Sequence, residues 1–156
     1  MIEIDDLTAL RDRIGQEIAI SDWIDVTQAR ISQFAEVTDD RQWIHLDAAR
    51  AAAESPFKTT VAHGFLVLSL VSPLARGAMA VTGLRLAINY GVNRVRFVSP
   101  LPAGSRIRGR FSPVAVQRVK DAIQVTWGVT IERDGGSKPV AVVEWVVRYY
   151  PEATQG

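Results

Sequence analysis

Both histidines of the chain lie in one short stretch that also carries a carboxylate and a helix start. Asp40 precedes His45 by five positions, and the run TTVAHGFLVLSL then places His63 and Gly64 at the beginning of an apolar helical segment. A neutral imidazole can take a proton near pH 7, and a neighbouring carboxylate can orient it or share the base role. A backbone N–H at a helix start can hold negative charge on a carbonyl oxygen. These groups suit the addition or removal of water beside a carbonyl, which favours an enzyme over a binding module.

Each of these residues also has a structural interpretation. On spacing alone, Asp40 can cap a turn and His45 can be an ordinary half-buried loop residue. Gly64 can be present only for tight packing. His63 at a helix start is better suited to a structural or positioning role than to that of a base, because the helix dipole disfavours its protonated form.

Composition narrows the class of protein. A chain of 156 residues is long enough for one domain with a real core, so we expect a single domain over residues 1–156. The hydrophobic share of 47% and the charged share of 22% are typical of folded proteins and argue against disorder. The formal net charge of +1 is too small to favour nucleic acid or a membrane surface, so a small-molecule partner is expected.

The absence of cysteine excludes disulfides and thiolate chemistry, and a zinc site would have to rest on two histidines and carboxylates. We therefore expect no metal. The longest apolar run, residues 65–75, is interrupted by serine and proline and is shorter than the roughly 20 residues of a membrane span. The N-terminus is acidic and amphipathic rather than basic and then apolar, so no secretion signal is expected. The expected location is the cytoplasm.

The elements that must position the chemical groups divide into a helical half and a strand half. Helices are expected where apolar residues recur at helical spacing or where a capping residue begins the segment: residues 7–14, 28–38 after Thr27, 48–55 after Asp47, and 61–80. The last is the longest and is apolar nearly all round, so it should be buried, with a kink or a split at Pro73.

Strands are expected at residues 18–23 and, from Leu86 onward, wherever apolar residues alternate. The alternation is clear at residues 106–111, 123–131 and 140–150, with a turn at residues 134–136. Consecutive strands without helices between them pair antiparallel, so the fold class is α+β, an antiparallel sheet wrapped on one buried helix. The last strand is apolar on both faces, which predicts an interior strand covered by a helix on one side and by a second subunit on the other.

Three segments resemble one family. The runs FAEVTDDRQWIHLD, TTVAHGFLVLSL and LAINYGVNRVRFVSPLPAGSRIRGR, in this order, are similar to the MaoC-like (R)-specific enoyl-CoA hydratases, especially the branch of nodulation protein N. The resemblance covers the chain from about Ser21 to Tyr149. It implies a hot-dog fold, in which a curved antiparallel sheet wraps a long central helix, and assembly as a homodimer.

The resemblance also implies a reaction, the reversible syn hydration of a trans-2-enoyl-CoA to an (R)-3-hydroxyacyl-CoA. Asp40 and His45 would be the catalytic pair, and the Gly64 N–H would be the oxyanion donor. Coenzyme A would be part of the substrate, and no metal or other cofactor would be needed. The sequence departs from the family where Gln42 and Trp43 replace the usual Asn-Pro, and Gln42 can still form hydrogen bonds to the substrate.

Further residues are predicted to contact the acyl-CoA. Arg94, Arg96 and Lys58 are candidates for binding the phosphates of coenzyme A. Asn89 is expected to line the pocket or support the catalytic loop, and His63 is counted with the substrate-binding residues.

Two other functions remain open from the residues. A hot-dog acyl-CoA thioesterase usually carries an Asp or Glu on or beside the central helix, and residues 61–80 contain neither. A non-catalytic acyl-CoA-binding protein would keep the fold without needing the Asp40, His45 and Gly64 set.

Overall fold

The structure is a computed structural model that describes residues 1–152. Its helices are the 3-10 helix η1 (Leu7–Arg13), α1 (Gln28–Thr38), α2 (Trp43–Leu46), α3 (Ala48–Glu54), α4 (Gly64–Ser69) and α5 (Val71–Ala78). Its strands are β1 (Ile2–Ile4), β2 (Ala19–Ile20), β3 (Ile24–Val26), β4 (Met79–Val81), β5 (Leu84–Phe97), β6 (Ser105–Val119), β7 (Ala122–Arg133) and β8 (Ala141–Pro151).

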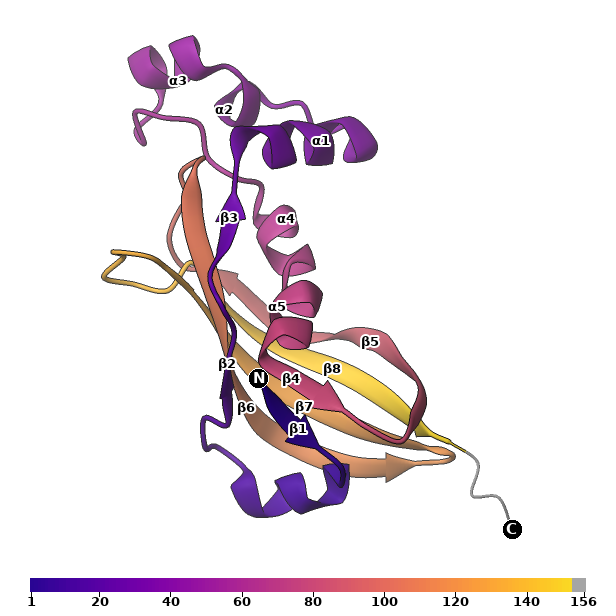
Figure 1. The fold of residues 1–156 in the computed structure, drawn as a ribbon. Coiled ribbons are helices and arrows are strands. Elements are labelled where there is room, and N and C mark those ends of the chain that lie inside the picture. The colour runs from indigo at the N-terminus through magenta and orange to yellow at the C-terminus, as the bar shows by residue number, and fades with distance from the viewer. Residues whose placement is uncertain (153–156) are drawn as a thin grey trace.

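One antiparallel sheet dominates the fold. Its strands follow the order β2-β6-β7-β8-β5. β3 also pairs with β6, nearer the start of that strand than β2 does. Helices α4 and α5 lie along one face of this sheet, and α1, α2 and α3 gather at one end of it (Figure 1). The predicted α+β arrangement of an antiparallel sheet around a buried helix is confirmed.

The core lies between the sheet and the α4–α5 pair. Alternate residues of β7 and β8 point toward the helices, and Val67 and Leu74 face them with exposed fractions of only 2% and 1%. Trp127 is fully buried in the sheet and donates its indole N–H to the Tyr149 hydroxyl at 2.9 Å. Burial of Tyr149 itself raises the pKa of its hydroxyl to about 12, although the bond from Trp127 acts in the opposite direction. Among residues 1–152, no helix has the length and apolar character needed to cross a membrane.

The expected helix over residues 61–80 is shorter and divided. Residues 61–63 are extended, and Val61 forms a bridge with Pro102. The break between α4 and α5 falls at Leu70, three residues before Pro73. Proline has no N–H to bond the carbonyl four residues earlier, which explains why the helix is interrupted there. From Met79 the chain is not helical but forms β4, which pairs in parallel with β1.

Other expectations hold with local changes. Thr27 and Asp47 cap α1 and α3 through bonds from the N–H groups of Arg30 and Arg50, as predicted. The expected strand at residues 18–23 is two short strands, β2 and β3. Ser21 lies between them and exchanges two hydrogen bonds with Gly109, one of them through its hydroxyl, which interrupts the regular ladder.

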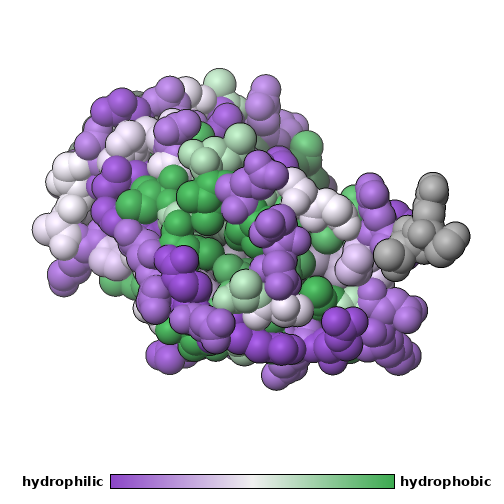
Figure 2. All heavy atoms as spheres, turned by 60° about the horizontal axis from the view of Figure 1, so that its bottom comes forward, coloured by the Kyte–Doolittle hydropathy of each residue, from purple (hydrophilic) through white to green (hydrophobic). Residues whose placement is uncertain are grey.

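β5 is the exposed edge of the sheet. β8 is an interior strand between β7 and β5, as expected. Its outer face is mixed, because Val146 is buried while Val142 remains 42% exposed. The apolar side chains of β5 are more exposed as a group: Leu86, Ile88, Tyr90 and Val92. Figure 2 shows a face on which hydrophobic residues gather in the middle and hydrophilic residues form the border.

Candidate active site

The segment between α1 and α3 forms a tight turn followed by a one-turn helix. Asp39 ends α1 in the left-handed conformation, with φ of 58°. The chain then passes through Asp40 and enters α2, a helix that the sequence analysis did not predict. The Asp40 side chain remains exposed at the surface, whereas His45 is buried to all but 7%.

His45 is held in one orientation by the backbone of the strand-like segment before α4. Its Nδ1 lies 2.6 Å from the carbonyl oxygen of Val61. Because a carbonyl can only accept, Nδ1 carries the proton and Nε2 keeps a free lone pair. The Val61 N–H returns a bond to the Ile44 carbonyl at 3.1 Å. The free Nε2 is therefore the basic nitrogen of His45.

Two residues that the sequence analysis missed fasten this turn to α1. Gln28 donates to the backbone carbonyl of His45 at 2.8 Å and accepts a bond from the Thr60 hydroxyl at 2.6 Å. Its amide thus joins α1, α2 and the segment before α4. Gln28 lies in the first turn of α1 with no distinguishing pattern around it, so nothing in the sequence pointed to this role.

His63 lies behind His45 rather than in the lining of the cavity. It is 2% exposed, and its Nε2 donates to the backbone carbonyl of Asp40 at 2.9 Å. Its ring stacks on that of His45, with centroids 3.7 Å apart and planes 25° apart. Within residues 1–152 its Nδ1 has no hydrogen-bond partner, a condition that typically costs about 1–3 kcal/mol for a buried group.

The structure brings the side chains of Asp40 and His45 together. One ligand atom from each of Asp40, His45 and His63 lies within 4.8 Å of the others. A cavity of about 350 Å³ adjoins this cluster, and both His45 and Gly64 line it. A water molecule forms hydrogen bonds of about 2.8 Å, so one water can bridge two groups at such a separation.

Asp40, His45 and His63 are also residue types that can bind a metal ion. A metal needs imidazole nitrogens that converge in the plane of each ring at about 2.0–2.1 Å. The rings of His45 and His63 are stacked, and each already donates one N–H to a carbonyl, which leaves one further nitrogen on each ring.

Burial also adjusts the basicity of His45. Its pKa lies below the ordinary value of 6.5, chiefly because burial disfavours the charged ring and also because His63 is close. The bond to Val61 and the charge of Asp40 act in the opposite direction. A lowered pKa keeps His45 neutral, and able to accept a proton, at neutral pH.

Gly64 opens α4 at the edge of the cavity. Its N–H is among the first N–H groups of a helix, which have no acceptor within the helix. A Cβ at this position would lie 2.8 Å from the Phe97 ring, closer than real side chains approach. The glycine is therefore required for Phe97 to pack here, and Phe97 is itself part of the cavity wall.

The predicted substrate-binding residues do not all lie at this cavity. Gln42 precedes α2, exposed, between Asp40 and His45. Trp43, beside it, packs under the Arg50 guanidinium at 4.3 Å, which ties this atypical turn to α3. Lys58 has a positive φ of 59° and follows Phe57, a cavity-lining residue.

Arg94 and Arg96 lie on the outer face of the sheet. They pair with Glu144 and Val142, whose side chains point away from the helices, whereas Phe97 points toward them. Both arginines are exposed. Their predicted contact with coenzyme A phosphates stays a prediction, and it requires the ligand to reach around the β5 edge.

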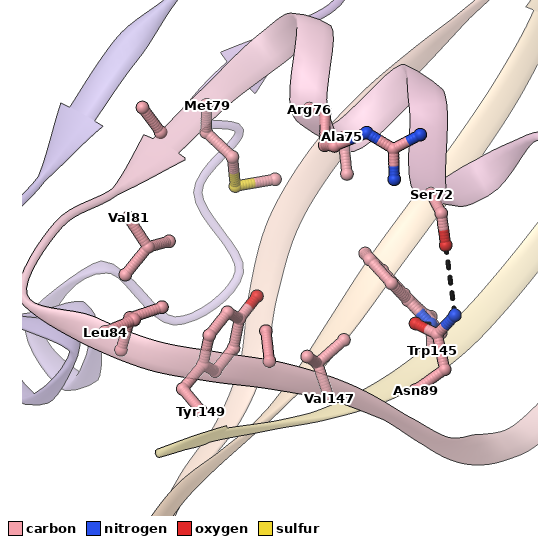
Figure 3. A pocket seen from close by; sticks show the side chains of 12 residues that line it. Ser72, Ala75, Arg76, Met79, Val81, Leu84, Asn89, Trp145, Val147 and Tyr149 are labelled. Atoms are coloured by element: carbon pink, nitrogen blue, oxygen red, sulfur yellow. Dashed lines mark hydrogen bonds between the residues drawn. The ribbon is translucent and has the colours of Figure 1, made fainter. Parts of the chain in front are cut away.

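Asn89 lies on β5, in an apolar groove between α5 and strands β5 and β8. It donates to Ser72 at 3.1 Å and accepts from the Trp145 indole at 3.2 Å, and neither bond involves the segment of Asp40 and His45. In Figure 3, Ser72 and Asn89 point toward each other near one end of this groove. The groove has a volume of about 500 Å³, and its wall includes Met79, Val81, Leu84, Val147 and Tyr149.

The sequence pattern of the MaoC-like domain matches residues 9–134. The chain belongs to the MaoC-like domain family. One relative, 3-hydroxyacyl-thioester dehydratase Z of Mycobacterium tuberculosis, is 46% identical over 136 residues, covering 86% of this chain and 89% of the relative. Nodulation protein N of Rhizobium leguminosarum bv. viciae is 43% identical over 142 residues, covering 90% of this chain and 88% of that protein.

Solved structures of the family agree with the fold. The unliganded R-hydratase PhaJ1 of Pseudomonas aeruginosa aligns with a TM-score of 0.67 at 26% identity, covering 89% of this chain and 83% of that one. The predicted hot-dog fold and the predicted family are confirmed. The prediction of a hydro-lyase agrees with MaoC-like relatives that are named as hydratases and dehydratases.

Proposed function

We propose that this MaoC-like protein hydrates trans-2-enoyl-CoA thioesters reversibly to (R)-3-hydroxyacyl-CoA. The observation that carries this proposal is the meeting of Asp40 and His45 beside a cavity that Gly64 also lines. The names of the dehydratase and hydratase relatives support the reaction class. A cytoplasmic location remains a prediction of the sequence.

In the proposed mechanism one water molecule lies between Asp40 and His45. His45 Nε2 takes a proton from it while the water oxygen forms a bond to the β-carbon, and the electron pair of the C=C bond moves toward the thioester. The thioester oxygen gains enolate charge and accepts a bond from the Gly64 N–H. The catalytic pair then returns a proton to the α-carbon, on the same face as the new hydroxyl. The water is fully consumed and no oxidant or reductant is needed.

No metal or other cofactor is part of this proposal. Its support is the geometry of the imidazole pair, which leaves one free basic nitrogen on His45 and directs the other His45 nitrogen to a carbonyl. The apolar groove beside α5 offers space for the acyl chain, which would run from the Gly64 cavity along β5.

The test is to follow crotonyl-CoA by the absorbance of its conjugated double bond. We expect the absorbance to fall after addition of the protein and the product to be the (R)-3-hydroxy thioester. A thiol reagent in a parallel sample separates this from a thioesterase, which would release free coenzyme A. Helices α4 and α5 carry no Asp or Glu, which favours the hydratase. No loss of absorbance with short and medium acyl chains would refute the proposal.

The pH dependence of this reaction should follow His45. His45 must be neutral to accept a proton, and its pKa is lowered by burial below 6.5. We therefore expect kcat/KM to fall as the pH is lowered, with the acid limb centred below pH 6.5. A pH–rate profile measured with crotonyl-CoA checks this, and an acid limb centred above 6.5 would contradict the assignment of His45 as the base.

We also propose that the protein forms a homodimer through β5. This strand has 14 residues and pairs only on its β8 side within the described part of the chain. Its exposed apolar side chains and unpaired backbone groups are the features of an edge strand that another chain can cover. Solved structures with a similar fold include complexes of two different chains, and here a second copy would supply the partner strand.

Substitution of Ile88 tests the dimer. Ile88 is 46% exposed on β5, so a lysine at this site can be solvated in a monomer but would be buried in a β5 interface. We expect Ile88→Lys to shift the protein from dimer to monomer in light scattering. The matched control is Val37→Lys, since Val37 is 81% exposed on α1. A wild-type monomer would contradict the proposal.

A further inference from the structure

His63 is the N-cap residue of α4, but its side chain forms no capping hydrogen bond. This position is usually filled by Ser, Thr, Asp or Asn, whose side chains accept a bond from the next turn. The His63 side chain points instead toward the segment that carries Asp40 and His45. Its ring makes three contacts there, and only 2% of the residue is exposed.

These contacts come from Asp40 in the turn, from His45 of α2 and from Phe34 of α1. The Nε2–H donates to the Asp40 carbonyl at 2.9 Å. One face stacks on His45 at 3.7 Å, and Phe34 of α1 lies 5.0 Å away at a tilt of 55°. A single side chain next to Gly64 therefore touches the backbone of the acid and the ring of the base.

Packing alone does not explain a histidine here. An apolar ring would fill the same space against Phe34 and His45 without leaving a buried, unpartnered Nδ1 among the described residues. What only the imidazole supplies is the bond to Asp40. The other attachments of this turn are made by the neighbouring Arg41, whose N–H bonds the Asp39 carbonyl and whose guanidinium pairs with Glu36 and Asp39. The bond from His63 is the one that reaches Asp40 from outside the α1–α2 segment.

We infer that His63 is a positioning residue of the catalytic pair: its Nε2–H fixes the Asp40 backbone and its ring face fixes the His45 plane. It acts through these two residues and does not contact the substrate. This inference rests on the proposed hydratase function, in which Asp40 and His45 must hold one water molecule. Small displacements of such groups can lower a rate about 100-fold.

Two substitutions separate the two contacts. His63→Phe keeps an aromatic face for the stack and loses the bond to Asp40, whereas His63→Gln offers an amide N–H near the Nε2 position and loses the stack. With crotonyl-CoA we expect His63→Phe to lower kcat about 100-fold with little change in KM, and His63→Gln to lower it about 10-fold. Near-ultraviolet circular dichroism checks that both variants are folded. A folded His63→Phe variant with wild-type kcat would overturn the inference.

A double substitution asks whether His63 acts through Asp40. If it does, Asp40→Asn combined with His63→Phe should be no slower than Asp40→Asn alone, since the group being positioned is already inactive. Losses that multiply would show that His63 acts independently of Asp40 and would overturn the inference.

A measurement without substrate distinguishes this inference from the proposed function. ¹⁵N spectra of the imidazoles at mildly alkaline pH should show the Nε2–H tautomer for His63 and the Nδ1–H tautomer for His45. An Nδ1–H tautomer for His63 would remove the bond to Asp40 and overturn the inference, whatever the activity. Absence of crotonyl-CoA turnover in the wild type, with the expected tautomers, would refute the proposed function alone. If His63→Phe does not fold, His63→Gln and these spectra decide the question.

Discussion

Replacement of His45 by glutamine is expected to lower kcat for crotonyl-CoA hydration by about 1,000-fold or more, in the upper part of the range for a general acid–base group. Glutamine retains a side-chain amide near the ring position but has no basic nitrogen. The bond between His45 Nδ1 and Val61 identifies Nε2 as the base, so removing the imidazole removes the proton acceptor itself.

Asp40→Asn is the companion to this variant. Asparagine keeps the size of the side chain and removes its charge, so we expect a loss of similar size with an unchanged folded spectrum. The Asp40 side chain is exposed, and the bond that His63 makes to Asp40 is to its backbone carbonyl rather than to its carboxylate. The control is Asp39→Asn, one residue away, where we expect near wild-type turnover. Wild-type rates in Asp40→Asn or His45→Gln would exclude that residue from the mechanism.

The second large effect is expected from removing the Gly64 N–H. Proline is well suited to the first position of a helix, and His63 has the extended conformation, φ −62° and ψ 138°, that a residue before proline prefers. A Cβ at position 64 would clash with the Phe97 ring, so the experiment uses a Phe97→Ala background. In that background Gly64→Pro removes the N–H, and Gly64→Ala adds a Cβ but keeps it.

We expect the Gly64→Pro variant to be about 100- to 1,000-fold slower in kcat than the Gly64→Ala variant in the same background, as found when one oxyanion donor is lost. KM should change little, because the donor acts on charge that develops in the transition state. Steady-state kinetics with crotonyl-CoA provide the comparison. Equal rates in the two variants would show that this N–H does not stabilise the enolate.

Much of the fold could be predicted because it follows from patterns of residues that are close in the sequence. The alternation of β7, the caps at Thr27 and Asp47, and the glycine turn at residues 134–136 depend on nearby residues only, and all are present. The central helix was predicted too long at both ends. Residues 61–63 and 79–81 are apolar enough for a helix, but tertiary pairing with Pro102 and β1 makes them extended.

The candidate site was likewise predictable only in part from the sequence. The sequence by itself determined the chemical groups and their order: an acid, a base five positions later, and a histidine and glycine opening an apolar helix. Side-chain types and short spacings are visible in a sequence because they depend on residue identity.

Only the tertiary structure decided how these groups are held. His45 is oriented by a carbonyl 16 residues away, Gln28 reaches Thr60 across 32 residues, and Asp40 is held through its backbone by His63, 23 residues on. Every residue has a carbonyl, so a bond to one leaves no trace in residue type. Which carbonyl is used is decided when folding brings distant segments together, and that choice sets the basic nitrogen of His45 and places His63 behind the pair.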